Sequence, residues 1–296
     1  MIQAAIVRGM QTFALTEHMP RNSNDDLYPE EVTLSPFSTS ITKISKIEAG
    51  DTIEPLFARH EAFLIEAVRL RQKYSDEVNI LIGFEGDWIR PSYANLILGL
   101  ASDPTVDFFI GSVHHVHQIP IDYDATFYKA ARDAAGGTDE LLFEDYFDSQ
   151  YEMLKALKPK VVGHFDLIRL LSDEPDRDLR EMKGVWEKAV RNLKLVVKQG
   201  GLMEINSAGL RKGLKEPYPG RALCGEFLKM GGKLTLSDDS HGTAQVGTNY
   251  LRAIEYLETL GVKELFTLDT NRHIAAQRNL SIRSVSLSSV KESFRA

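Results

Sequence analysis

The sequence predicts an α/β fold in which parallel strands alternate with helical crossovers. Three observations indicate this. Apolar, β-branched runs of strand length recur, helical stretches separate most of them, and each run ends in a polar group able to bind a metal. The six runs are TFALTEH, NILIGFEGD, DFFIGSVHH, KVVGHFDL, GLMEINSAG and KLTLSDDSH. Since 43% of the 296 residues are hydrophobic, the chain is long enough for one large core. We therefore expect a single domain over residues 1–296.

The first two elements are a helix and a strand. MIQAAIVRGM predicts an amphipathic helix, because its apolar residues recur every three to four positions from Ile2 to Met10. Residues 11–18 then predict a short buried strand that ends in an acid and a histidine. A helix followed by a strand is typical of the middle of an alternating α/β pattern, not of its beginning. A closed barrel would need at least one strand more than the six, and we expect its place to be before Met1.

Longer connections and helices follow in turn. Residues 19–42 are rich in Pro, Ser, Asn and Asp and predict a long loop that serves as a lid. Residues 122–141 predict a second excursion after a strand. Helical patterns cover residues 54–74, 139–157, 185–199 and 244–261. From about residue 280 the chain is Ser-rich with weak apolar alternation, and we expect little order in this tail.

Composition excludes several classes of protein. The formal net charge is -7 and no basic block is present, so we expect no nucleic-acid partner. No apolar run is long enough for a membrane span, and the first residues do not resemble a signal peptide. The single cysteine, Cys224, excludes an internal disulfide framework and is interpreted as a small buried residue. We expect a cytoplasmic protein.

The polar groups at the strand ends are the candidate functional residues. They are His18, Glu85, His114, His164, Asp239 and His241. In this fold class the carboxyl ends of the strands meet on one rim, so these side chains should converge there. Mixed imidazole and carboxylate ligands suit zinc, iron or manganese. Asp239 and His241 are two residues apart and face the same way in an extended segment. If the strand continues that far, His114 and His115 face opposite ways, so at most one of them should be a core ligand.

Taken together these motifs resemble the PHP (polymerase and histidinol phosphatase) superfamily, and within it the histidinol-phosphatase branch of fungi and some bacteria. The motifs LTEHMPR, GFEGDW, GSVHHV, GHFDLIRL, EINSAGLRK and SDDSHG carry the resemblance, in the family's order, over roughly residues 8–260. The resemblance implies a distorted (β/α)7 barrel, here with its first strand missing. It also implies up to three divalent metal ions, Zn, Mn or Fe, at the strand ends.

The resemblance also assigns roles to the candidate residues. Glu85 would bridge two metals, and His114 and His164 would complete one of those two sites. Asp239 would serve the other with Glu85, while His18 and His241 would belong to a third. Arg169 and Arg211 would bind the substrate phosphate, with Arg21 as a third candidate, although each could instead form an ordinary salt bridge. Asp239 or His241 would give the leaving alcohol a proton through water.

The implied activity is hydrolysis of L-histidinol phosphate to L-histidinol and phosphate, in histidine biosynthesis. The family begins with an HxH strand that ligates two of the metals, and this chain has no such segment. Of the metal sites that the resemblance implies, only the one formed by Glu85, His114 and His164 keeps a complete set of three ligands in this chain. We therefore expect an incomplete gene model or a shortened product with little or no activity. The alternatives are a catalytically impaired PHP-fold protein and a PHP phosphoesterase for another small phosphorylated substrate.

Overall fold

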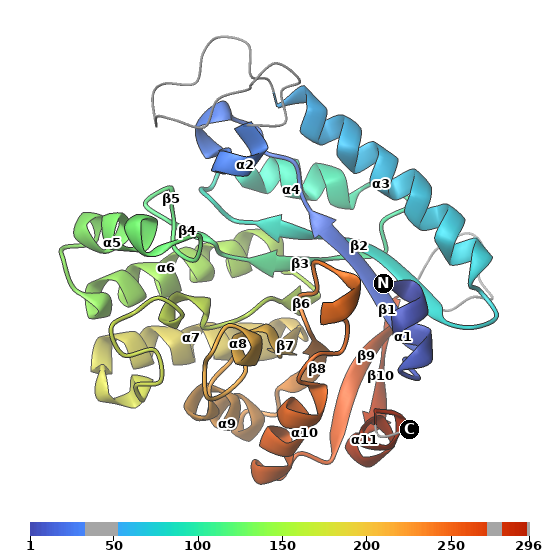
Figure 1. The fold of residues 1–296 in the computed structure, drawn as a ribbon. Coiled ribbons are helices and arrows are strands. Elements are labelled where there is room, and N and C mark those ends of the chain that lie inside the picture. The colour runs from blue at the N-terminus through green and yellow to red at the C-terminus, as the bar shows by residue number, and fades with distance from the viewer. Residues whose placement is uncertain (33–52, 271–279, 295–296) are drawn as a thin grey trace.

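The computed structural model describes residues 1–32, 53–270 and 280–294 (Figure 1). Its centre is a six-stranded parallel sheet in the order β1-β2-β3-β6-β7-β8. These six strands coincide with the six predicted runs, so the predicted α/β class is confirmed. They are β1 (Thr12–His18), β2 (Asn79–Asp87), β3 (Phe108–Ser112), β6 (Val161–Val162), β7 (Leu202–Asn206) and β8 (Lys233–Ser237). Two antiparallel pairs, β4 (His115–Val116) with β5 (Ile119–Pro120) and β9 (Glu264–Thr270) with β10 (Leu280–Ser286), complete the strands.

The described residues form helices outside the sheet, at its edges and in its loops. They are α1 (Ile2–Val7), α2 (Pro29–Val32), α3 (Glu54–Lys73), α4 (Tyr93–Ala101), α5 (Ala125–Ala134), α6 (Asp139–Leu157), α7 (Lys183–Gln199), α8 (Ala208–Arg211), α9 (Arg221–Lys229), α10 (Tyr250–Thr259) and α11 (Leu287–Ser293). The helix predicted over 244–261 begins later, at Tyr250, because Gly247 and Asn249 have φ values of +69° and +63° that interrupt it. Among the described residues, no helix combines the length and the apolar character that a membrane crossing requires.

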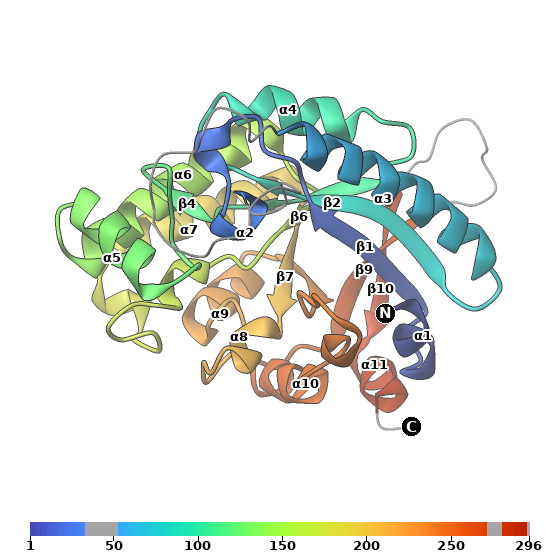
Figure 2. The same cartoon turned by 45° about the horizontal axis from the view of Figure 1, so that its top comes forward.

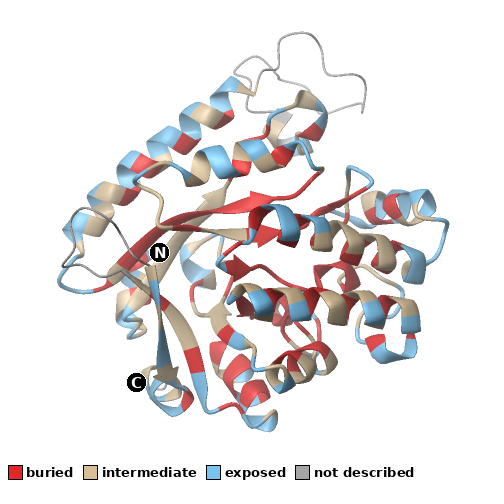
Figure 3. Cartoon of the chain, turned by 180° about the vertical axis from the view of Figure 1, so that it is seen from behind, coloured by how far each residue is buried: buried red, intermediate tan, exposed pale blue. Residues whose placement is uncertain are grey.

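The sheet curls into a half-barrel, with helices α3, α4, α6 and α7 along its outer side (Figure 2). Its edges are β1 and β8, each of which pairs with a single strand in the described part of the chain. The β9–β10 hairpin packs Leu268 against the inward-facing Leu81, Phe108, Val161 and Leu202. Burial follows the pairing: β2 is buried along almost its whole length, whereas β1 is intermediate throughout (Figure 3). The edges are therefore the least covered part of the sheet.

The two ends of the described chain lie side by side. Helix α1 lies next to α11 in both views (Figures 1 and 2), and Gly9 approaches the Ser293 side chain. We expected little order after residue 280, but the structure has β10 and α11 there, because Leu280 and Ile282 pack against the inner cluster and Ser286 caps α11. Residues 33–42 of the predicted lid loop lie outside the described residues.

Candidate metal centre

A carboxylate and two imidazoles converge at the carboxyl ends of three neighbouring strands. Glu85 lies near the end of β2, His114 follows β3 and His164 follows β6. The Nε2 atoms of the two histidines are 3.0 Å apart, and Glu85 Oε1 is 3.1 Å from His164 Nε2 and 3.5 Å from His114 Nε2. One ligand atom from each residue lies within 4.8 Å of the others, and all three residues are buried. The predicted convergence of these three ligands is therefore present.

The backbone explains why these side chains meet. In the β2–β3 register Glu85 pairs with Ile110, so His114 lies just beyond the paired residues at the same rim. Strand β6 approaches closely because Gly163 has no side chain, and a Cβ there would collide with Ser112 Oγ. Glu204 of β7 accepts a hydrogen bond from the His164 amide (2.6 Å) and so fixes the backbone that orients this ring.

Charge within the cluster favours the ionised forms. Burial disfavours the His114 imidazolium, but the nearby carboxylates of Asp87 and Glu85 outweigh it and raise the pKa of His114 to about 10. Burial likewise opposes the Glu85 carboxylate, yet the surrounding histidines hold its pKa well below the ordinary range. The pKa of Glu204 is raised, chiefly by burial. The buried carboxylates and imidazoles of the cluster thus stabilise each other's charged forms.

The remaining predicted ligands form a looser rim beside this cluster. Glu85 turns its second oxygen toward His18, whose Nδ1 is 3.3 Å from Oε2. His18 Nε2 is 3.5 Å from His241 Nε2, and His241 Nδ1 is 3.6 Å from the Asp239 carboxylate. Asp239 stands outside the three-residue group, with its backbone at φ +48°. These residues therefore lie in a row, and the structure does not gather them around one point as it does the first three.

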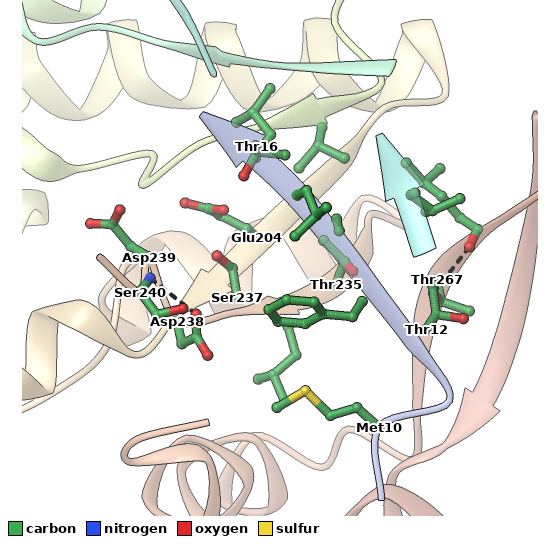
Figure 4. A pocket seen from close by; sticks show the side chains of 18 of the residues that line it. Met10, Thr12, Thr16, Glu204, Thr235, Ser237, Asp238, Asp239, Ser240 and Thr267 are labelled. Atoms are coloured by element: carbon green, nitrogen blue, oxygen red, sulfur yellow. Dashed lines mark hydrogen bonds between the residues drawn. The ribbon is translucent and has the colours of Figure 1, made fainter. Parts of the chain in front are cut away.

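A cavity of about 600 Å³ runs from these side chains into the half-barrel, between β1 and β8. Thr12 and Thr16 of β1 and Thr235 and Ser237 of β8 line it, together with Glu204 (Figure 4). Asp239 also lines this cavity. The rim residues thus border a space, lined by both polar and apolar side chains, that can admit a small molecule.

Comparison with known proteins identifies the family. The PHP domain model matches residues 1–208. This chain belongs to the PHP family. It falls in the histidinol-phosphatase branch, because it is 42% identical over 269 residues (90% of this chain, 82% of the relative) to the "Probable histidinol-phosphatase" of Schizosaccharomyces pombe. It is also 34% identical over 274 residues (83% and 78%) to the histidinol-phosphatase of Saccharomyces cerevisiae.

A solved structure supports the fold of this PHP chain. Histidinol phosphate phosphatase from Lactococcus lactis subsp. lactis Il1403, complexed with zinc, L-histidinol and phosphate, superposes with a TM-score of 0.59 at 19% identity. The match covers 90% of this chain and 88% of that one. The half-barrel is thus consistent with the distorted barrel of the PHP type that the sequence predicts.

The predicted phosphate-binding arginines have partners inside the protein. Arg169 donates to Asp166 and to the carbonyl oxygens of Pro175, Glu216 and Pro217, and its guanidinium lies over the Tyr218 ring. Arg211 donates to the carbonyls of Asp238 and Asp239, both at 2.8 Å, and so holds the loop of the rim ligands. In this PHP chain both arginines support the loops around the site, and their contact with phosphate stays a prediction.

Two buried acids next to the ligands were not predicted. Asp87 is two residues after Glu85, and Glu204 lies on β7 beside His164. The period of two in a strand could have identified Asp87, since it faces the same side as Glu85. His114 and His115 do not face opposite ways, because β3 ends at Ser112 and the Nδ1 atoms of both rings lie within 3.5 Å of the Asp87 carboxylate. His117 lies away from the cluster and pairs with Asp145 at 2.8 Å.

Proposed function

We propose that this protein is a metal-dependent histidinol-phosphatase, which hydrolyses L-histidinol phosphate to L-histidinol and phosphate in histidine biosynthesis. The single observation that supports it best is the buried Glu85, His114 and His164 group, in a chain 42% identical to a named histidinol-phosphatase. The lone buried Cys224 suits a reducing compartment, and we propose a cytoplasmic location.

The three residues suit a divalent cation. Two imidazole nitrogens 3.0 Å apart face the same carboxylate oxygen, an arrangement that in the absence of a cation depends on shared protons. One carboxylate and two imidazoles are a ligand set that zinc, manganese and iron accept. A bound ion would lower the pKa of a water molecule and polarise a phosphoryl oxygen. We propose Zn²⁺, Mn²⁺ or Fe²⁺ at this position.

The residues of the rim would handle the substrate. We propose that His18, Asp239 and His241 hold further cations when these are present, since Glu85 offers its second oxygen to His18. Asp239 and His241 border the cavity, and either could pass a proton through water to the leaving alcohol. Arg211 donates a hydrogen bond to the backbone carbonyl of Asp239 and would thereby hold this proposed proton donor in position. Arg169 and Arg211 are the proposed phosphate ligands.

One observation favours a second candidate, a metal-binding PHP protein with impaired catalysis. Among the described residues, only Glu85, His114 and His164 form a three-ligand group, while Asp239 and the rim histidines do not. Since phosphoryl transfer in such sites relies on paired metals, a single complete set would bind a cation but support slow turnover. Substrate preference and rate therefore have to be measured separately.

Phosphate release separates these candidates. Protein stripped with a chelator should be assayed with L-histidinol phosphate and with p-nitrophenyl phosphate, before and after addition of Zn²⁺ or Mn²⁺. An active histidinol-phosphatase would show metal-dependent turnover that favours histidinol phosphate at least about tenfold, equivalent to about 1.4 kcal/mol of selectivity. Equal rates on both esters would assign a different substrate. Metal binding without any turnover would support the impaired protein.

A further inference from the structure

His114 is held between a carboxylate on one ring nitrogen and the ligand cluster on the other. Its Nδ1 lies 3.3 Å from Asp87 Oδ1, whereas its Nε2 points to His164 and Glu85. Neither His114 Nδ1 nor Asp87 Oδ1 has a hydrogen-bond partner of standard geometry in the described part of the chain, and the 3.3 Å ion-pair contact brings these two buried polar atoms together. The Asp87 side chain is 0% exposed, so no solvent competes for that oxygen. The two atoms can satisfy each other only if Nδ1 carries a proton.

A second contact holds Asp87 in place. Arg21, from the segment after β1, donates to Asp87 Oδ2 at 2.7 Å, and its own side chain is 1% exposed. Arg21 is supported in turn by Glu31 at 3.5 Å and by the Tyr28 ring beneath its guanidinium. Because a buried arginine keeps its charge, the Asp87 carboxylate stays anionic and stays oriented.

We infer that Asp87 is a positioning residue for the metal centre: with Arg21 it fixes His114 in the tautomer that carries the proton on Nδ1 and offers Nε2 to a cation. The inference rests on the proposed metal site, and it assigns Asp87 no contact with substrate. A carboxylate behind a metal-binding histidine orients the ring and makes it a stronger ligand. Asp87 therefore supports cation binding through His114 rather than by direct coordination.

A double-mutant cycle on Zn²⁺ affinity tests this. The dissociation constant should be measured by competition with a chelating dye for the wild type, Asp87→Asn, His114→Gln and the double variant. We expect Asp87→Asn to weaken Zn²⁺ binding about 10–100-fold. In the His114→Gln background the same change should have less than about a threefold effect, because the ring through which Asp87 acts is absent.

Asp107→Asn is the matched control. Asp107 lies just before β3, at the opposite end of that strand from the metal centre, and its side chain is also 0% exposed and 2.7 Å from an arginine, Arg71. Asp107→Asn should lower the free energy of unfolding but leave Zn²⁺ affinity within about twofold. An equal loss of affinity in this control would mean that Asp87 acts only through stability, which overturns the inference.

The remaining outcomes are distinct. If the wild type binds no Zn²⁺, the proposed metal site fails. If the wild type binds Zn²⁺ and Asp87→Asn binds it equally well, or if the two changes are additive, the positioning role is wrong. Should Asp87→Asn fail to fold, Arg21→Lys provides the milder test, since it loses the planar donor but keeps the charge. An unchanged Zn²⁺ affinity in Arg21→Lys would then overturn the inference.

Discussion

The two halves of the metal centre differ in how their strands are paired. Glu85, His114 and His164 come from β2, β3 and β6, each of which has a neighbour on both sides. His18 ends the edge strand β1, and Asp239 follows the edge strand β8 by two residues. The histidine side chains of the inner half are 8% and 5% exposed, whereas those of His18 and His241 are 39% and 59% exposed. The ligand atoms that are buried and lie close together thus come from strands that are paired on both sides.

The physical reason is the number of contacts that fix each ligand. The inner strands are held on both sides by ladder hydrogen bonds, and buried side chains such as Asp87 and Glu204 then fix the rings. An edge strand has one free side and fewer packed neighbours, so its side chains are less determined. We therefore expect the inner half to dominate cation affinity. Changes at Glu85 and His18 test this difference, and changes at Arg169 and His60 test residues outside the two halves.

The largest effect should come from Glu85, the residue shared by both halves. Glu85→Gln keeps the shape but removes the charge that faces His114, His164 and His18. We expect phosphate release to fall at least about a thousandfold, equivalent to about 4 kcal/mol of transition-state stabilisation. Glu17→Gln, one strand away and paired with exposed Arg59, is the control and should change the rate less than about twofold. A Glu85→Gln enzyme with normal turnover would remove Glu85 from the site.

A change at Arg169 tests whether this arginine holds the loop after β6 or binds the phosphate of the substrate. Arg169→Met leaves the buried Asp166 without its ion pair, and we expect a loss of about 3 kcal/mol in the free energy of unfolding. Urea denaturation measures it. Arg177→Met, an exposed arginine of the same segment, should cost less than about 1 kcal/mol. If Arg169→Met leaves stability unchanged and raises KM for histidinol phosphate, the arginine serves phosphate rather than the loop.

His18 tests the outer half directly. His18→Asn removes the imidazole that lies 3.3 Å from Glu85 Oε2. We expect Zn²⁺ affinity at the inner group to fall by less than about tenfold, because His18 faces the second oxygen of Glu85 and only the edge of the His114 ring, not the ligand atoms that converge. Calorimetric titration with Zn²⁺ gives the value. A loss as large as that of His164→Asn would show that the two halves are a single unit.

The smallest effect concerns a histidine outside the centre. His60 on α3 is 5% exposed, and neither ring nitrogen has a hydrogen-bond partner among the described residues. Burial lowers its pKa below the ordinary value of about 6.5. The unfolded chain therefore binds a proton more readily than the folded one, and stability should fall as pH drops below about 6.5. His60→Leu should flatten this slope in urea titrations at about pH 7.5 and 5.5, and an unchanged slope would contradict it.

Sequence patterns predicted the paired regions better than the edges and loops. Strand periodicity and order along the chain located β1, β2, β3, β6, β7 and β8, and thereby placed Glu85, His114 and His164 on one rim. Periodicity alone could not predict that Arg169 would be enclosed by carbonyls from residues 175, 216 and 217, because those contacts join distant loops. The tail was misjudged for the same reason: Leu280 and Ile282 form a strand by pairing with β9, a contact that local alternation cannot show.

The central claim is that a divalent cation binds between Glu85, His114 and His164. Anomalous diffraction at the zinc edge, from crystals of this protein grown with Zn²⁺, tests it most directly. We predict a strong peak about 2.0–2.2 Å from one Glu85 oxygen and from Nε2 of both histidines, the distances typical of zinc ligands. The absence of a peak there, with zinc bound only at other residues, would contradict the account.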